Sequence, residues 1–188
     1  RGDSTLRGHY PLETELLARA EEMHRGRAVD GEIICPYFKE GGRFTIGNVH
    51  YVKYGNELIP AGETEFAEDK TFGYHCSNLK EYVEEKTGGR YPAHEVLDVS
   101  LEELRSLDYA AITNKLLALH DFGKIVVNAV DACDLKVFCI ALYDAMNQGR
   151  RFMFRTAAGF VKEFGAIRER PLLSREEMVQ ENCGTGGI

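Results

Sequence analysis

Three segments of the sequence place an arginine beside hydroxyl side chains, in a loop or at the end of an expected strand. They are Asp3-Ser4-Thr5-Leu6-Arg7-Gly8, Gly41-Gly42-Arg43-Phe44-Thr45 and Arg155-Thr156-Ala157-Ala158. A guanidinium group can hold a carboxylate or a phosphate with two parallel hydrogen bonds, and hydroxyl and backbone N–H groups complete such a site. One such segment alone is typical of a surface ion pair. An anion site therefore requires that folding brings several of them together.

The first segment also contains a carboxylate, which has two interpretations. Asp3 could bind a substrate hydroxyl, or accept a proton from one if its pKa were raised. Asp3 and Ser4 could equally well cap the following turn. Asn128 and Asp131, near the end of the strand expected at residues 124–130, have the same two interpretations, and for Asp131 we favour the cap.

The sequence contains no self-contained motif for a metal or a nucleotide. Its six histidines form no HxxxH or HExxH pair, and the acidic residues 63–70 lack the spacing of a calcium loop, so we interpret them as a solvated face and expect no metal site. Neither a GxxxxGK[ST] nor a GxGxxG loop is present. The five cysteines are odd in number and form no CxxC pair, which favours a reducing, cytoplasmic setting.

Length and composition indicate an ordinary globular protein. The 188 residues suffice for one domain, or for one domain and a fragment, and 44% of them are hydrophobic. The net charge of -7 disfavours a nucleic-acid partner. No apolar run approaches the roughly 20 residues that a membrane helix needs, and the first residues contain no signal-peptide core. We therefore expect neither a nucleic acid nor a membrane as partner.

Short strands and helices alternate along the chain. Helices are expected at residues 11–24, 78–86, 101–107, 113–120 and 135–147 and after residue 156, and strands at 31–38, 96–99, 124–130 and 151–156. Ser77 is expected to cap the second of these helices, and Ser100 is expected to form a capping box with Glu103 at the third. This pattern predicts an α/β fold with a mainly parallel sheet and helices on both faces. An expected strand at residues 44–52, followed by 58–60, predicts an inserted β-hairpin. Ligands of such sheets bind beyond the carboxyl ends of the strands.

Four segments, taken in order, resemble the N-terminal, substrate-binding domain of the four-carbon acid sugar kinase family. They are DSTLRGHYPLE, CPYFKEGGRFT, ETEFAEDKTFGY and FRTAAGFV. The resemblance extends from the first residues to about residue 170. It implies a Rossmann-like domain of an ATP-dependent kinase that phosphorylates the terminal hydroxyl of threonate, erythronate or 3-oxo-tetronate type acids. ATP and Mg²⁺ are the cofactors that it implies, held mostly by a C-terminal domain outside this chain.

The chain departs from the family at both ends. The family's opening strand and its acidic Asp-Asp-x-Thr-Gly loop would precede Arg1, and its ATP site would follow Ile188. We therefore expect residues 1–170 to be the C-terminal portion of a sugar-acid-binding domain, which is thus incomplete. Residues 171–188 are expected to be a linker and the start of the nucleotide-binding domain, with 186–188 resembling its first strand. The chain alone is expected to be inactive. Its expected partners are a sugar acid and the missing domain, and a homo-oligomer is a further alternative.

The resemblance also assigns roles to the matching positions. The residues expected to face the sugar acid are Asp3, Ser4, Arg7, Arg43, Thr45, Arg155 and Thr156. Arg7 or Arg43 is the expected partner of the carboxylate, and Asp3 of a hydroxyl. The catalytic base stays unassigned, because the missing acidic loop is at least as good a candidate as Asp3. Two alternatives remain: a non-catalytic sugar-acid-binding or sensor module, and arginines that form only surface ion pairs.

Overall fold

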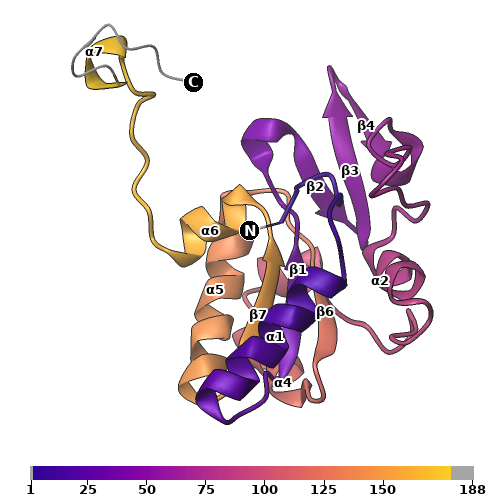
Figure 1. Ribbon diagram of the computed structural model, residues 1–188. Helices are drawn as coiled ribbons and strands as arrows, with labels where there is room; N and C mark the ends of the chain where they lie inside the picture. Colours follow the sequence, from indigo (N-terminus) through magenta and orange to yellow (C-terminus); the bar gives the residue numbers. More distant parts are fainter. Residues whose placement is uncertain (1, 179–188) are drawn as a thin grey trace, which may run out of the picture.

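The computed structural model describes residues 2–178, which contain two β-sheets (Figure 1). The strands are β1 (Gly31–Cys35), β2 (Arg43–Ile46), β3 (Val49–Tyr54), β4 (Glu57–Pro60), β5 (Leu97–Val99), β6 (Gly123–Val127) and β7 (Phe152–Thr156). The helices are α1 (Leu12–Arg25), α2 (Leu79–Thr87), α3 (Leu101–Arg105), α4 (Tyr109–Ala118), α5 (Ala132–Asn147), α6 (Ala158–Phe164) and α7 (Arg175–Met178). The prediction for residues 186–188 lies outside the described residues.

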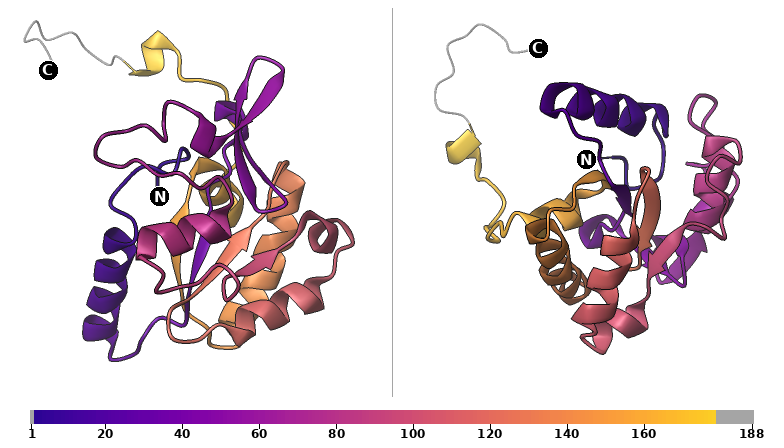
Figure 2. Two further views of the ribbon diagram at one scale, coloured as in Figure 1. Left: turned by 90° about the vertical axis from the view of Figure 1, so that its right-hand side faces the viewer. Right: turned by 90° about the horizontal axis from the view of Figure 1, so that it is seen from below.

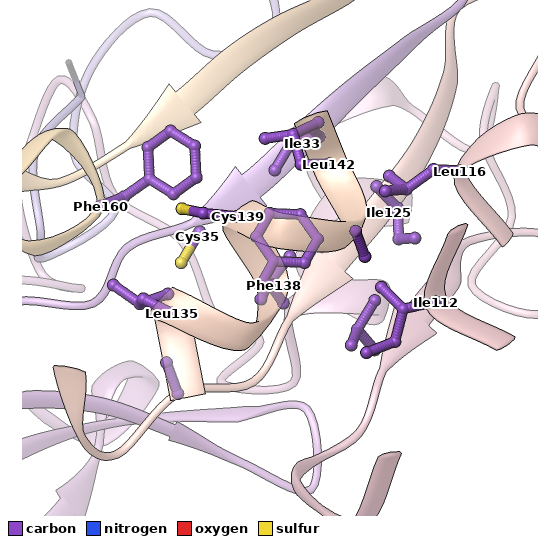
Figure 3. Close-up of a cluster of buried hydrophobic side chains, with 14 of the residues drawn as sticks. Ile33, Cys35, Ile112, Leu116, Ile125, Leu135, Phe138, Cys139, Leu142 and Phe160 are labelled. Atoms are coloured by element: carbon purple, nitrogen blue, oxygen red, sulfur yellow. The ribbon is translucent and has the colours of Figure 1, made fainter. Parts of the chain in front are cut away.

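The larger sheet is parallel, with strand order β5-β6-β1-β7, and it confirms the predicted fold class. Every residue of β1 is buried, because neighbouring strands flank it and helices cover both faces of the sheet. Helices α1 and α2 lie on one side, and α4 and α5 on the other (Figure 2). Successive side chains of a strand point to opposite faces. Ile33 therefore packs with Phe138 and Leu142 of α5 (Figure 3), and Ile34 packs with Leu79 of α2.

Local capping signals set the starts of three helices. Ser100 and Glu103 form the predicted capping box of α3, with bonds of 3.1 and 2.8 Å. Asp131 caps α5, as predicted. The expectation that Ser77 caps α2 is wrong: Asn78 accepts the bond from the helix, because the Ser77 hydroxyl instead accepts one from the Gly62 N–H.

The smaller sheet is an antiparallel three-stranded unit, in the order β2-β3-β4, where the sequence predicted a two-stranded hairpin. The single strand expected at residues 44–52 is interrupted by a turn at Gly47 and Asn48. Their φ angles of 56° and 67° are both left-handed, as a tight two-residue hairpin turn requires. Ile46 and Val49 pair directly across this turn. These paired residues lie on one face although they are three positions apart, so the turn reverses the phase of the alternation. The run looked like one strand because β-branched and aromatic residues lie on both sides of the turn.

Helix α1 forms where the periodicity predicts it, but its apolar stripe lies at the surface. The side chains of Leu12, Leu16 and Met23 are 55%, 54% and 87% exposed. The opposite flank of the helix contacts the protein through the buried Thr14, and an ion pair of 2.9 Å joins Glu21 to Arg151, next to β7. The apolar spacing therefore indicates the helix correctly without indicating its buried side.

A fully buried ion pair lies inside the core beneath α1. Glu32 of β1 and Lys124 of β6 are neighbours in the sheet, and their Oε2 and Nζ atoms are 2.7 Å apart. The ring centroids of Phe122 and Tyr91 lie 3.5 and 4.4 Å from the ammonium nitrogen. Burial lowers the pKa of Lys124, and the Glu32 carboxylate only partly opposes it. Each charge is tolerated in the core because the other is present.

Removing one member of this pair should therefore destabilise the fold strongly. We expect Lys124→Met to lower the free energy of unfolding by about 3–5 kcal/mol, because it leaves the Glu32 carboxylate without its counter-charge. The double variant with Glu32→Leu should recover most of that loss, since it removes the orphaned charge as well. Urea unfolding at neutral pH measures both. A single variant as stable as the wild type would contradict this interpretation.

Candidate functional site

Residues 3–7, here called the DSTLR loop, lie beyond the carboxyl ends of β1 and β7. The Gly2 N–H donates to the carbonyl of Thr156, the last residue of β7, over 2.6 Å. A small cavity below the loop is lined by Asp3, Pro36 and Arg155, among others. The loop thus occupies the edge at which parallel α/β sheets bind their ligands.

The carboxylate of Asp3 organises the loop. Its Oδ1 accepts from the Thr5 N–H at 2.9 Å, and its Oδ2 accepts from the Thr5 hydroxyl at 2.8 Å and from Arg7 Nε at 2.9 Å. Burial raises the pKa of Asp3, but these hydrogen bonds outweigh it, and the pKa lies below its usual value. A carboxylate of low pKa is a weak base, so the geometry favours Asp3 as the group that orients Arg7. Its role as catalytic base stays a prediction.

Two of the three predicted arginine segments meet at Phe66. The Cζ atoms of Arg7 and Arg43 each lie 5.2 Å from the centroid of the Phe66 ring, within the range of cation–π contacts. Asp69 Oδ2 lies 3.9 Å from Arg7 Nη1. Phe66 and Asp69 were not predicted as site residues, because the acidic composition of residues 63–70 indicated a solvated face. The signal available was the aromatic residue inside that acidic run.

The hydrogen-bond donors of the Arg43 guanidinium are only partly paired within the described residues. Arg43 is the first residue of β2, and its Nη1 donates to the Gly41 carbonyl. Its Nε is buried and has no hydrogen-bond partner among residues 2–178. An unpaired buried donor is costly, and an incoming acceptor would relieve that cost. Arg43 is therefore well suited to bind an anion.

Arg155, in the third segment, holds the loop from the other side. Its Nη1 lies 3.0 Å from Glu13 Oε2, its Nη2 donates to the Arg7 carbonyl at 3.0 Å, and its Cζ lies 5.2 Å from the centroid of the Tyr10 ring. Only 7% of Arg155 is exposed, and its neighbour Thr156 is also buried. Both residues thus lie in supporting positions, and direct contact of either with a ligand stays a prediction.

His50, which was not predicted as a site residue, contacts both Thr45 and Ser4. The fully buried His50 lies 3.0 Å from Thr45 Oγ1 through Nδ1 and 2.8 Å from the Ser4 carbonyl through Nε2. A carbonyl oxygen only accepts, so Nε2 carries the proton and the Thr45 hydroxyl donates to Nδ1. Thr45 is thus placed behind the loop, and a direct ligand contact by Thr45 or Ser4 stays a prediction. The available signal was the Gly47-Asn48 dipeptide, because a two-residue turn there places His50 opposite Thr45.

The carbonyl oxygens of residues 4–6 accept hydrogen bonds, in order, from His50, Tyr74 and Tyr82. The distances are 2.8, 2.7 and 2.8 Å. Leu6 has a φ of 68°, a left-handed conformation that is costly for a side chain of this kind. Three buried donors thus hold a backbone conformation that the loop would not adopt alone.

The asparagine considered with the loop, Asn128, has a structural place. Its amide nitrogen donates to Asn48 Oδ1 at 2.8 Å and to the Val99 carbonyl at 2.9 Å, and its oxygen accepts from the Asn48 N–H at 2.7 Å. It therefore ties the turn of the smaller sheet to the parallel sheet. Among residues 2–178, no group of three His, Cys, Asp or Glu side chains is arranged to bind a metal, and no helix has the length and apolarity of a membrane span.

Comparison with known proteins identifies similar sequences and folds. Residues 1–164 match a family model described as a sugar-binding N-terminal domain. Protein HI1011 of Haemophilus influenzae, which carries the family model DUF1537, is 16% identical with a TM-score of 0.62. A protein from Salmonella typhimurium LT2 that carries the provisional name tRNA synthase is 17% identical, also with a TM-score of 0.62. The alignments cover 88% and 86% of this chain but only 36% and 35% of those chains. No curated protein matches the sequence.

The buried His50 makes stability depend on pH. Burial lowers its pKa to about 4 from the usual 6.5. Below about pH 6.5 the unfolded chain binds a proton at this histidine and the folded chain does not. We expect the free energy of unfolding to fall by up to about 3 kcal/mol between these two pH values, relative to His50→Gln, which does not titrate. Urea unfolding of both proteins across this range measures the difference, and parallel pH profiles would refute it.

Proposed function

Because the chain belongs to the family of sugar-binding N-terminal domains, we propose that it binds a sugar acid beside Phe66, with Arg43 on the acid's carboxylate. The observation that carries this proposal is the convergence of Arg7 and Arg43 on one ring. The fork of a guanidinium matches a carboxylate in geometry and charge. Arg43 is only partly buried, so its guanidinium can contact a ligand. Its Nε is buried and has no partner among the described residues.

The neighbouring groups suit the hydroxyls of such a ligand. Asp3 and Arg7 form an ion pair of 2.9 Å at the same site, with side chains 31% and 38% exposed. A half-exposed carboxylate and a guanidinium side by side offer both an acceptor and donors to a polyol. We assign Asp3 to a ligand hydroxyl, because its low pKa keeps it ionised and able to accept a hydrogen bond.

We further propose that the whole protein is an ATP-dependent kinase of four-carbon sugar acids. Support comes from the resemblance of the four motif segments and from structural neighbours in the DUF1537, or four-carbon acid sugar kinase, family. The expected substrates are threonate, erythronate or 3-oxo-tetronate type acids, phosphorylated at the terminal hydroxyl. This chain spans about a third of its neighbours' length. We place the ATP and Mg²⁺ sites mostly in the rest of the protein.

In such a reaction this domain would contribute position and charge. Phosphoryl transfer depends mainly on alignment of the two substrates and on electrostatic stabilisation. A carboxylate held by Arg43 and a hydroxyl held by Asp3 fix two points of a short chain, and so direct its far end. The isolated chain is therefore proposed to bind the acid without turning it over.

The proposal predicts a loss of affinity when Arg43 changes. In the full-length protein that contains this chain, we expect Arg43→Ala to weaken sugar-acid binding by about 10–100-fold, the usual effect of losing a hydrogen bond to a charged group. Arg43→Lys should recover only part of it, because an ammonium lacks the planar fork. Arg25→Ala is the matched control, since Arg25 is 63% exposed on α1 and pairs with Glu21.

Isothermal titration calorimetry with threonate, erythronate and a 3-oxo-tetronate measures these affinities. Binding of none of the acids by the wild type, or equal binding by Arg43→Ala, would refute the site. ATP consumption with a bound acid supports the kinase. Binding without consumption favours the alternative, a non-catalytic sugar-acid-binding module.

A further inference from the structure

We infer that His50 is a positioning residue, which sets the DSTLR loop, and Arg7 with it, in register with Arg43 for the ligand. The inference builds on the proposed function. His50 is fully buried and contacts the Ser4 carbonyl, so its effect on a ligand passes through the loop. Through this contact, the smaller sheet, which contains Arg43, also fixes the position of the loop that contains Arg7.

The antiparallel sheet fixes the position of the imidazole. His50 of β3 pairs directly with Thr45 of β2, two residues after Arg43. Thr45 is itself buried, and its backbone exchanges two hydrogen bonds of 3.1 Å with Ala129, beyond the end of β6. The imidazole therefore has a fixed place relative to both Arg43 and the parallel sheet.

On the loop side, the contact between His50 and the Ser4 carbonyl is connected to Arg7 through Asp3. The Ser4 carbonyl that His50 holds adjoins Asp3, whose carboxylate accepts from Arg7 Nε. A shift of that peptide would move the Asp3 carboxylate and with it the guanidinium at Phe66. Tyr74 and Tyr82 hold the next two carbonyls, but they come from outside the Arg43 sheet.

The imidazole acts in one tautomer. With the Ser4 carbonyl on Nε2 and the Thr45 hydroxyl on Nδ1, the neutral ring with hydrogen on Nε2 satisfies both contacts. The charged groups that act on it are Arg43, which lowers its pKa, and Asp3, which raises it, but burial is the largest influence and lowers it. The ring is therefore neutral at neutral pH, and binding there does not depend on its titration.

Two substitutions separate the hydrogen bonds from the volume of the ring. His50→Phe keeps an aromatic ring without the hydrogen bonds, and His50→Gln retains a donor for the Ser4 carbonyl. In the full-length protein we expect His50→Phe to weaken threonate binding about tenfold or more, and His50→Gln to stay within about threefold of the wild type. Amide hydrogen exchange of residues 5–7 should accelerate in His50→Phe alone. His94→Phe, at a side chain that is 80% exposed, is the matched control.

Nitrogen chemical shifts of the His50 ring test the tautomer directly. Hydrogen on Nε2 from about pH 5 to about pH 8 supports the inference, and hydrogen on Nδ1 or a charged ring overturns it. Should His50→Phe not fold, Thr45→Val, which removes only the hydroxyl donor, should weaken binding in the same direction.

Each further outcome decides one question. His50→Phe that binds threonate as the wild type does, in folded protein, overturns the positioning role even if its unfolding free energy is lower. A wild type that binds none of the sugar acids refutes the proposed function instead. In that case the exchange of residues 5–7 still decides whether His50 holds the loop, because that measurement needs no ligand.

Discussion

The hydrogen bonds to the carbonyls of residues 4–6 are the constraint on which the site depends. Their donors belong to β3, to the segment before α2, and to α2 itself, so three distant parts of the chain meet at one short loop. A non-glycine residue with positive φ costs about 1–2 kcal/mol, and Leu6 is held in that conformation. Three buried polar side chains thus fix the backbone of residues 4–6, and the Asp3 and Arg7 side chains are thereby oriented together.

The second sheet extends this constraint to Arg43. It is attached at the carboxyl end of β6 by the backbone pair of Thr45 with Ala129, and by the side-chain pair of Asn48 with Asn128. These contacts place the first residue of β2 where its guanidinium reaches Phe66. The inserted sheet therefore determines the distance between the two arginines of the proposed site.

The sequence predicts those features whose signals are local. The capping box at Ser100, the buried strand β1 and the alternation that implies a parallel sheet all depend on residues close together in the chain, and all are confirmed. The roles of His50 and Arg155 depend on partners 46 and 148 residues away, which no local pattern reveals. The turn at Gly47 was missed for a different reason: β-branched and aromatic residues lie on both sides of it, which is typical of one continuous strand.

The balance of charge at the site indicates the kind of ligand it suits. Arg155 lies 3.0 Å from Glu13, and Arg7 lies 2.9 Å from Asp3, so each has a carboxylate beside it. Among residues 2–178, Arg43 has no carboxylate within 4.0 Å. One positive charge thus remains without a close counter-ion in a chain whose net charge is -7. Under the proposed function, one guanidinium is thus left for one carboxylate, and the ion-paired groups beside it are left for hydroxyls.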